Sequence, residues 1–452
     1  MQQLLVNAEL DDLIRLHGSP LNIVNPLPMG QNISQLTQVA KDRDVDFQVF
    51  FARKSNRCLT FVDQAAQCGA GIDTASQNEV QQCIDCGMDP HRIICTAAVK
   101  SESLIHNCLR HGVCICIDNE DELSLVEYEA DRLGCVASIA LRIGGFEHEG
   151  AKLVTRFGFD VDRDRGIVDR FSESSLRIDG IHFHLDGYDA AQRVTGIRTA
   201  CDWIERLRRS GQSPTFIDMG GGFPISYLES EQEWTDFWHE HELALRGKRD
   251  PITYRNHGLG RIVVDGTVHG SPKSYPYFQS PVRDEWFAAI LDAEVDGTSI
   301  AQKIRTAGLQ LRCEPGRSLM DGCGVTAARV EFRKRSANGD WLIGLSMNRT
   351  QCRTSSDDFL VDPIVVPTRD AGGEPMSGYL VGAYCTESEL LSLRRLHFPN
   401  GIQRGDLVVF PNTAGYLMHF LESRSHQFPL AKNVIYQDEP GAELPLDPID
   451  AF

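Results

Sequence analysis

The chain has 452 residues, more than one ordinary domain contains, so two domains are expected. Hydrophobic residues make up 42% of the chain and charged residues 24%, which describes a globular protein and excludes a disordered or fibrous one. The net charge of −18 argues against nucleic acid and anionic membranes as partners, because both require basic surfaces. A small-molecule substrate is therefore the default expectation.

The start of the chain, MQQLLVNAELDDL, lacks the basic segment and the apolar run of a signal peptide, and no later run of about 18 apolar residues occurs. We therefore expect a cytoplasmic protein without a membrane span. The 14 cysteines are then expected to be reduced thiols. Cys83 and Cys86 are expected to be two thiols on a helix rather than part of a metal site, because no second pair of ligands follows them.

Short β-branched runs alternate with amphipathic helical patterns from residue 47 to residue 317. This alternation is typical of repeated βα units around a parallel sheet. Eight strands are predicted, at residues 47–55, 71–76, 92–97, 113–119, 137–143, 180–184, 215–221 and 309–316. Eight is the number of strands that closes a (β/α)8 barrel of the TIM type.

The helices between these strands carry recognisable signals. Ser76 and Glu79 form the S-x-x-E pattern of a capping box, which predicts the start of a helix that ends at Gly87. A second helix is predicted from about residue 192 to Gly211. Its apolar face consists of Ala200, Trp203, Ile204 and Leu207.

Roughly ninety residues separate the seventh and eighth predicted strands, including an aromatic, proline-rich stretch from Tyr254 to Phe287. We expect a lid or an interface element there. After Arg317 the pattern changes to β-rich segments with Gly, Pro and Asp turns, which predicts a separate β domain. The expected organisation is an α/β barrel at residues 26–320 with an insertion around 228–305, and a β-rich barrel or sandwich made of residues 1–25 and 321–452.

Glycine-rich turns follow the last two predicted strands, where barrels of this kind commonly bind phosphate. Gly220, Gly221 and Gly222 lack side chains, so their backbone N–H groups can approach an anion closely. Gly316 and Arg317 follow the eighth strand, and a guanidinium can donate two hydrogen bonds to phosphate oxygens. Either turn alone could be only a tight corner, but the two together predict a ligand that carries phosphate.

Polar residues also end three of the predicted strands. Lys54 ends the first strand and could form a Schiff base, although a lone lysine there would more often extend to solvent. Glu314 ends the eighth strand, where a carboxylate could pair with a pyridinium nitrogen, although it could instead be a buried ion-pair residue. His182 and His184 end the sixth strand; without a third ligand nearby we expect no metal, but one imidazole stacked on a cofactor ring and the other forming a structural hydrogen bond.

Seven motifs stand in one order along nearly the whole chain: FFARKSN, GIDTASQNE, GIHFHLDGY, IDMGGGFP, CEPGR, GAYCTESELL and GDLVVFPNTAGY. The set resembles the ornithine/diaminopimelate decarboxylase family, the fold-type III enzymes that depend on pyridoxal 5′-phosphate (PLP) and have an alanine-racemase-like barrel. The resemblance implies a lyase of amino-acid metabolism that carries PLP and decarboxylates an amino acid.

The resemblance also implies roles for single residues. Lys54 would form the internal aldimine, with Asp73 and Glu79 near it, His184 would stack on the pyridine ring and Glu314 would pair with its nitrogen. The phosphate would be held by Gly220, Gly221, Gly222, Gly316, Arg317 and Tyr416. Decarboxylation would proceed through an external aldimine and a quinonoid, and Cys385 would reach across a homodimer interface to protonate the carbanion in the partner's site.

Two departures from the family pattern bear on the substrate. The family usually follows its stacking histidine with a Gly-Ser pair that helps to hold phosphate, whereas residues 185–187 here are Leu-Asp-Gly. Thr386 stands where relatives carry an acid that binds the distal amine of the substrate, and Glu387 or Glu389 could take over that role.

Arg349 and Arg353 occupy the stretch that contacts the distal end of the substrate in relatives, so they are candidates for binding a carboxylate or other anion, unless they are only surface arginines. Together with the insertion, these differences favour a larger amino-acid conjugate over free ornithine, lysine or diaminopimelate. Two other functions stay open. One is a racemase or isomerase on the same barrel, with Tyr384 as an acid or base; the other is a non-catalytic regulatory homologue, which would have no need to keep Lys54, Glu314 and Cys385.

Overall fold

The computed structural model describes residues 9–172, 176–355, 358–368, 373–437 and 444–450. The chain divides into two compact units. The barrel unit contains residues 26–224 and 281–319, and the β unit contains residues 1–25, 225–280 and 320–452.

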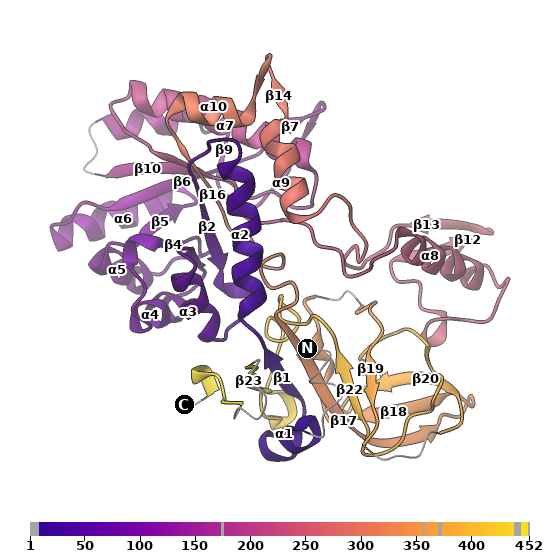
Figure 1. Ribbon diagram of the computed structural model, residues 1–452. Helices are drawn as coiled ribbons and strands as arrows, with labels where there is room; N and C mark the ends of the chain where they lie inside the picture. The colour runs from indigo at the N-terminus through magenta and orange to yellow at the C-terminus, as the bar shows by residue number, and fades with distance from the viewer. Residues whose placement is uncertain (1–8, 173–175, 356–357, 369–372, 438–443, 451–452) are drawn as a thin grey trace. The chain divides into compact units, whose positions relative to one another are not determined.

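Eight parallel strands close into a barrel, in the order β10-β11-β16-β2-β3-β4-β5-β6, and β6 pairs with β10 to complete the ring (Figure 1). The strands are β2 Phe47–Ala52, β3 Gly71–Thr74, β4 Ile93–Cys95, β5 Cys114–Ile117, β6 Ser138–Gly144, β10 Arg177–His182, β11 Phe216–Asp218 and β16 Gln310–Cys313. The eight predicted strands and the (β/α)8 fold class are therefore confirmed.

Helices connect the strands and cover the barrel, so strands such as β3 and β5 are buried along their whole length. They are α2 Leu27–Lys41, α3 Thr60–Gln67, α4 Gln77–Asp85, α5 Glu102–His111, α6 Glu120–Leu133, α7 Ala190–Arg209, α9 Arg283–Asp292 and α10 Ile300–Ala307. The segment between β6 and β10 contains the short strands β7 Glu147–His148, β8 Ala151–Lys152 and β9 Phe159–Asp160 instead of a long helix.

Two predicted helices show how local sequence sets their limits. Helix α4 begins after Ser76, whose side chain accepts a hydrogen bond from the N–H of Glu79 at 3.3 Å. The carboxylate of Glu79 accepts from the N–H of Ala75 at 2.7 Å, so the reciprocal bond of the predicted capping box goes to the preceding residue. Helix α7 begins after the cap Asp189 and buries all four predicted apolar residues.

The inside of the barrel is filled by side chains from several strands, among them Phe50 and Phe216, which share one apolar cluster. Two strand glycines make room for these rings. A Cβ at Gly71 would lie 2.5 Å from the ring of Phe50, and a Cβ at Gly180 would lie 2.4 Å from the ring of Phe216. Both positions therefore require glycine for space rather than for backbone conformation.

The β unit is built on an eight-stranded sheet in which β19-β22-β17-β18-β20-β21 are neighbours. Strand β1 Leu21–Val24 pairs antiparallel with β17 and parallel with β23, so the predicted N-terminal strand joins this sheet. The other strands are β17 Gly324–Arg335, β18 Trp341–Leu345, β19 Ile364–Val366, β20 Met376–Val381, β21 Leu396–Phe398, β22 Leu407–Phe410 and β23 Lys432–Ile435. Its apolar core also includes residues of α1 Glu9–His17.

The long segment between β11 and α9 belongs to two units. Residues 225–280 group with the β unit and contain α8 Glu231–Leu245 and the hairpin of β12 Arg261–Val264 and β13 Thr267–Gly270. An aromatic cluster that includes Trp234 and Tyr277 packs there, and Tyr277 donates a hydrogen bond to the carbonyl of Asp358 at 3.2 Å. The following residues form α9, the hairpin β14 Glu294–Val295 with β15 Thr298–Ser299, and α10, all in the barrel unit.

All 14 cysteines are free thiols; Cys83 is buried in α4 and Cys86 caps that helix. Across the described ranges, no helix combines the length and the apolar character needed to cross a membrane.

We predict that Gly180→Ala destabilises the barrel by about 1–3 kcal/mol, because the new methyl group would overlap the buried ring of Phe216. The measurement is urea unfolding followed by circular dichroism. Gly166→Ala is the matched control, since a Cβ there meets nothing within 4 Å and its stability should change by less than about 0.5 kcal/mol. Equal stability of the two variants would contradict this account of the barrel interior.

Candidate active site

The C-terminal ends of the barrel strands bring together most of the predicted site residues. Lys54 follows β2, Asp73 lies in β3, His182 ends β10, Asp218 ends β11 and Glu314 follows β16. Because parallel strands end at the same rim of a barrel, residues distant in sequence become neighbours there.

Lys54 forms an ion pair with a buried acid. Its Nζ lies 3.0 Å from Oδ2 of Asp73, whose side chain is fully buried, while the side chain of Lys54 remains 36% exposed. The hydroxyl of Thr96 donates to the other carboxylate oxygen of Asp73. Burial raises the pKa of Glu79, and the charges of Lys54 and Asp73 also act on that carboxyl. Lys54 is therefore a partly accessible amine held in place by an acid.

A second, more deeply buried group surrounds Glu314. The ligand atoms of His182, Asp218 and Glu314 lie within 4.8 Å of one another, and none of these residues is more than 4% exposed. Nε2 of His182 is 3.3 Å from Oε1 of Glu314, yet Oε1 has no hydrogen-bond partner among the residues described. An unsatisfied carboxyl oxygen in a buried position indicates that a donor is to be supplied by a ligand.

Burial sets the charge of this group. It raises the pKa of Glu314 to about 8, with a further contribution from the nearby charge of Asp73. It also raises the pKa of Asp218 to about 7, to which the charge of Glu314 adds. Burial and the charge of Arg142 lower the pKa of His182 to about 3. Without a cationic ligand, the group therefore favours neutral acids beside a neutral imidazole.

The glycine turn after β11 leaves no space for side chains. A Cβ at Gly220 would lie 2.5 Å from the carbonyl oxygen of Phe183, and one at Gly221 would lie 2.7 Å from that of Glu314. A Cβ at Gly222 would overlap a buried guanidinium nitrogen. The N–H groups of Gly221 and Gly222 have no hydrogen-bond partner within the described chain, so two donors are available for an anion.

His184 lies beside this turn, with its Nδ1 3.2 Å from the position that a Cβ of Gly220 would take. Burial, together with the positive charge of Lys54, lowers the pKa of His184 to about 3. Its ring is therefore a neutral imidazole, which suits stacking on a charged aromatic ring. Phe183 points the other way and packs against Phe146 at a centroid distance of 5.5 Å, as strand alternation predicts. Gly316 is buried and Arg317 is half-buried in the next turn.

The structure adds Arg142, Asp218 and Arg193 to the residues that sequence reasoning identified. Arg142 is buried at the end of β6, donates to the carbonyl of Thr96 at 2.6 Å and lies 3.4 Å from Asp118. One signal was present in the sequence, since this arginine interrupts an otherwise apolar strand. Asp218, which accepts the N–H of Gly220 at 2.9 Å, stands two residues before the glycine turn.

The remaining predicted site residues lie in the β unit. They are Arg353, Cys385, Thr386, Glu387 and Tyr416. The segment from Cys385 to Glu387 is exposed after β20, and Glu387 forms an exposed ion pair with Arg255 at 3.4 Å. Arg353 lies 3.7 Å from the buried carboxylate of Asp358.

In the same unit, the charge of Arg349 is paired and the backbone of Tyr416 has an unusual conformation. Arg349 pairs with the buried Glu389, whose carboxylate accepts the backbone N–H of Arg349 at 2.8 Å. Tyr416 is half-buried, has a positive φ of 71° and packs edge-on against Phe420.

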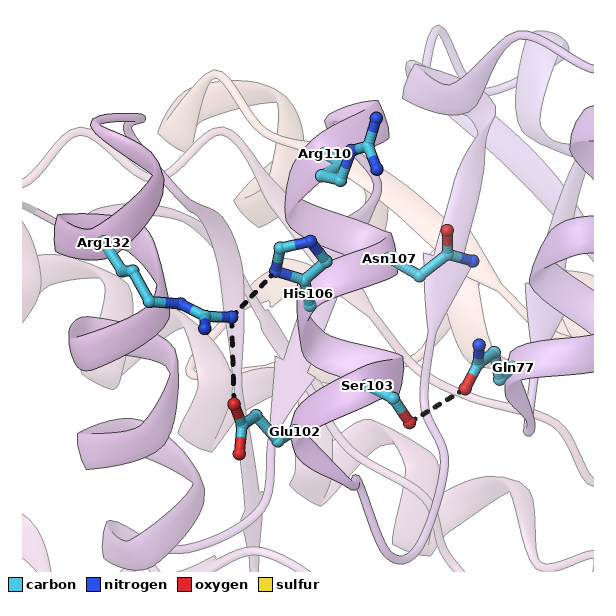
Figure 2. Close-up of a pocket in the computed structure, with 7 residues that line it drawn as sticks. All are labelled: Gln77, Glu102, Ser103, His106, Asn107, Arg110 and Arg132. Carbon is cyan, nitrogen blue, oxygen red and sulfur yellow. Dashed lines mark hydrogen bonds and ion pairs between the residues drawn. The ribbon is translucent and has the colours of Figure 1, made fainter.

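A separate polar pocket of about 430 Å³ lies on the outer surface of the barrel, between α4, α5 and α6 (Figure 2). It is lined by Gln77, Glu102, Ser103, His106, Asn107, Arg110 and Arg132. Arg132 links its neighbours, since it lies 3.7 Å from Glu102 and 3.2 Å from Nδ1 of His106. None of the predicted site residues lines this pocket, so it is distinct from the strand-end group.

The strand-end group has the features that PLP requires: a partly exposed lysine paired with an acid, a buried carboxyl with an unsatisfied oxygen, and a glycine turn with free N–H donors. These features define a PLP-binding barrel. The sequence accordingly matches the family "Pyridoxal-dependent decarboxylase, pyridoxal binding domain" over residues 30–248.

Relatives of known sequence and structure agree. The chain is 31% identical to the uncharacterized protein y4yA of Sinorhizobium fredii, over 96% of this chain and 91% of that protein. It is 22% identical to diaminopimelate decarboxylase of Pseudomonas aeruginosa, over 81% of this chain and 76% of that enzyme. The crystal structure of diaminopimelate decarboxylase from M. jannaschii has the same fold, with a TM-score of 0.72 at 17% identity, covering 95% of this chain and 89% of that one.

The chain belongs to the family of pyridoxal-dependent decarboxylases. The enzyme class predicted from the sequence, a PLP-dependent carboxy-lyase, and its cofactor, PLP, are thereby confirmed.

We predict that Glu314→Gln removes a pH dependence from the stability of the cofactor-free protein. The folded state raises the pKa of Glu314 to about 8, from an ordinary value of 4.5, so it binds more protons than the unfolded state between these values. Stability contributed by this group is therefore lost as pH rises through that window. Between about pH 5 and pH 8, the melting temperature of the wild type should fall at least about 2 °C more than that of the variant. If the melting temperatures of the wild type and the variant fell by the same amount over this pH range, Glu314 would not be buried as described.

Proposed function

We propose that this protein decarboxylates an amino acid, either a diamino acid or an amino-acid conjugate, and that it works as a homodimer. The observation that carries the proposal is the pairing of a partly exposed Lys54 with Asp73, in the same barrel rim as the buried and unsatisfied carboxyl of Glu314. A barrel built only for stability would gain nothing from a buried acid that has one oxygen without a hydrogen bond.

Bound PLP supplies an electron sink for the electrons of the bond that is cleaved at Cα of the substrate. Lys54 would hold the cofactor through Nζ, and Asp73 would position that nitrogen and stabilise its positive charge. Glu314 would face the pyridine nitrogen, where an opposite charge offsets the cost of burial and lets the carboxyl ionise. His184 would lie against the ring as a neutral imidazole. We propose no metal at the group of His182, Asp218 and Glu314.

The phosphate would be held by backbone donors of the two glycine turns, by the guanidinium of Arg317 and by the hydroxyl of Tyr416. The free N–H groups of Gly221 and Gly222 support this assignment, as do the close approaches that exclude side chains there. The residues assigned to phosphate are Gly220, Gly221, Gly222, Gly316, Arg317 and Tyr416.

Cys385 would deliver the proton that replaces the departing carboxylate at Cα. Its side chain is exposed in the β unit, so its thiol is accessible to a second copy of the chain. We therefore propose that each active site of the dimer combines Lys54 of one subunit with the thiol of the other. A cytoplasmic location, where thiols stay reduced, suits this role.

The substrate is proposed to differ from diaminopimelate. Thr386 replaces an acid in the segment assigned to the distal amine, and the buried Asp358 already balances the charge of Arg353. The low identity to diaminopimelate decarboxylase, at 22%, is compatible with a different substrate. We propose a larger amino-acid conjugate, with Arg353, Thr386 and Glu387 near its distal end.

Decarboxylation is favoured over racemisation because Tyr384 is already engaged. Its hydroxyl donates to the carbonyl of Ser423 at 3.3 Å, and its ring stacks on His426 with a centroid distance of 5.0 Å. A racemase would need a second acid or base free to exchange a proton at Cα.

The direct test is carbon dioxide release by the PLP-loaded protein over a panel of L- and D-diamino acids and their carboxylated conjugates. We expect release from a conjugate, and its loss in Lys54→Ala, because the amine that carries the cofactor is removed. Efficient turnover of free ornithine or diaminopimelate alone would contradict the proposed substrate class. Inversion at Cα without carbon dioxide release would contradict decarboxylation itself.

A second test asks whether the active sites are shared. Lys54→Ala and Cys385→Ala subunits should each be inactive or nearly so, but a random mixture should recover about one quarter of wild-type activity, because half of the dimers contain one intact site of two. The mixture is prepared by reversible dissociation and assayed by carbon dioxide release. Absence of recovery would place Lys54 and Cys385 of the same subunit in one site.

A further inference from the structure

Arg193 is a fully buried cation without an acidic partner. It lies in the first turn of α7, and its side chain is 0% exposed. No carboxylate in the described parts of the chain forms an ion pair with it. The charges of Asp186 and Asp189 act on Arg193, but both acids are exposed and accept backbone N–H groups at 3.0 and 2.8 Å instead. Burial lowers the pKa of Arg193 to about 10, which leaves it charged at neutral pH.

Only one of its three nitrogens has hydrogen-bond partners. Nη2 donates to the carbonyl oxygens of Leu185 and Gly187, at 2.8 and 2.9 Å, and approaches that of Gly221 at 3.5 Å. Nε and Nη1 have no partner among the described residues. The guanidinium carbon also lies 5.8 Å from the centroid of the Trp286 ring, which offsets part of the cost of burial. A buried charge that is only partly satisfied remains costly, so a nearby negative charge would stabilise it.

The position of Arg193 identifies where that charge would come from. Its Nη2 occupies the space that a Cβ of Gly222 would need, so the guanidinium packs directly against the glycine turn. By holding the carbonyl oxygens of Gly187 and Gly221, it leaves the N–H groups of Gly221 and Gly222 free for an anion. The segment that it also holds, residues 185–187, is the one that departs from the Gly-Ser pattern noted above.

We propose that Arg193 is a positioning residue of the phosphate site: it balances the charge of the bound phosphate and orients the glycine turn toward it. The identity of the ligand, the phosphate of PLP, rests on the proposed function. In this chain the buried guanidinium of Arg193 thus compensates for the serine hydroxyl that the family's Gly-Ser pair would provide.

A purely structural role of Arg193 would affect ligand binding in a different way. If Arg193 only stabilised the fold of the barrel, its loss would weaken ligands with and without phosphate to the same extent. If it balances phosphate charge, its loss weakens ligands with phosphate and spares those without it. Pyridoxal, which keeps the aldehyde and the ring but lacks the phosphate, separates the two cases.

The experiment is titration of the cofactor-free protein with PLP and with pyridoxal, followed by visible absorption, for the wild type, Arg193→Met and Arg193→Lys. Arg193→Met should raise the Kd for PLP by about 10- to 100-fold, as expected for a charge-assisted interaction, and change the Kd for pyridoxal by less than about twofold. Arg193→Lys, which keeps the charge, should restore part of the PLP affinity. Arg208→Met, on the same helix, is the matched control and should leave both affinities unchanged, since Arg208 only donates to backbone carbonyls of Pro214 and Ala307.

A second readout does not depend on the proposed function. Inorganic phosphate should raise the melting temperature of the cofactor-free wild type and of Arg208→Met, and raise that of the Arg193 variants less. If Arg193→Met does not fold, the comparison of the wild type with Arg193→Lys serves for both the cofactor titration and the phosphate-dependent melting temperature. Equal weakening of PLP and pyridoxal, or no change in either, would overturn the proposal. Absence of any absorption change in the wild type would instead overturn PLP binding, while the phosphate readout would still test Arg193.

Discussion

The burial of Glu314 is the constraint on which the active site depends. A carboxyl buried at the C-terminal rim of an eight-stranded barrel loses its hydration, so its charged form becomes stable only beside a cation. His182 is a poor partner for this purpose, because the same burial keeps its imidazole neutral. The charge of Glu314 raises the pKa of Asp218, so these two carboxyls do not readily ionise together. The rim of the barrel therefore gains most from a ligand that presents a cationic ring nitrogen to Glu314, as PLP does.

Charge and burial also distinguish the other groups at the rim. Lys54 and Asp73 form a nearly neutral pair that is reachable from solvent, whereas Arg193 is a cation that burial has left without an acid. A cofactor with a reactive aldehyde, a basic ring nitrogen and a phosphate would match the amine of Lys54, the carboxyl of Glu314 and the guanidinium of Arg193, in that order. The proposed roles thus follow from complementary charge, and each can be tested by removing one charge at a time.

Sequence periodicity predicted the fold because each barrel strand is a short buried run bounded by turns and followed by an amphipathic helix. Lys54 and Glu314 were identifiable because they end two of these strands. Asp218 and Arg193 were not, because their importance arises from neighbours that are distant in sequence, such as Asp218 beside Glu314 and Arg193 behind Gly222. For Arg142 the sequence offered one signal, a charge within an apolar strand. The grouping of residues 225–280 with the β unit also lay beyond sequence reasoning, since chain order places them between two barrel strands.

The proposed role of Lys54 as the residue that carries PLP can be tested directly. Reduction of the PLP-loaded protein with borohydride fixes the cofactor to the amine that holds it, and peptide mass spectrometry then locates the added mass. We expect one pyridoxyl group per chain, on the peptide that contains Lys54, and its disappearance in Lys54→Ala. Label on another lysine, or no fixed label at all, would exclude Lys54 as the residue that carries PLP.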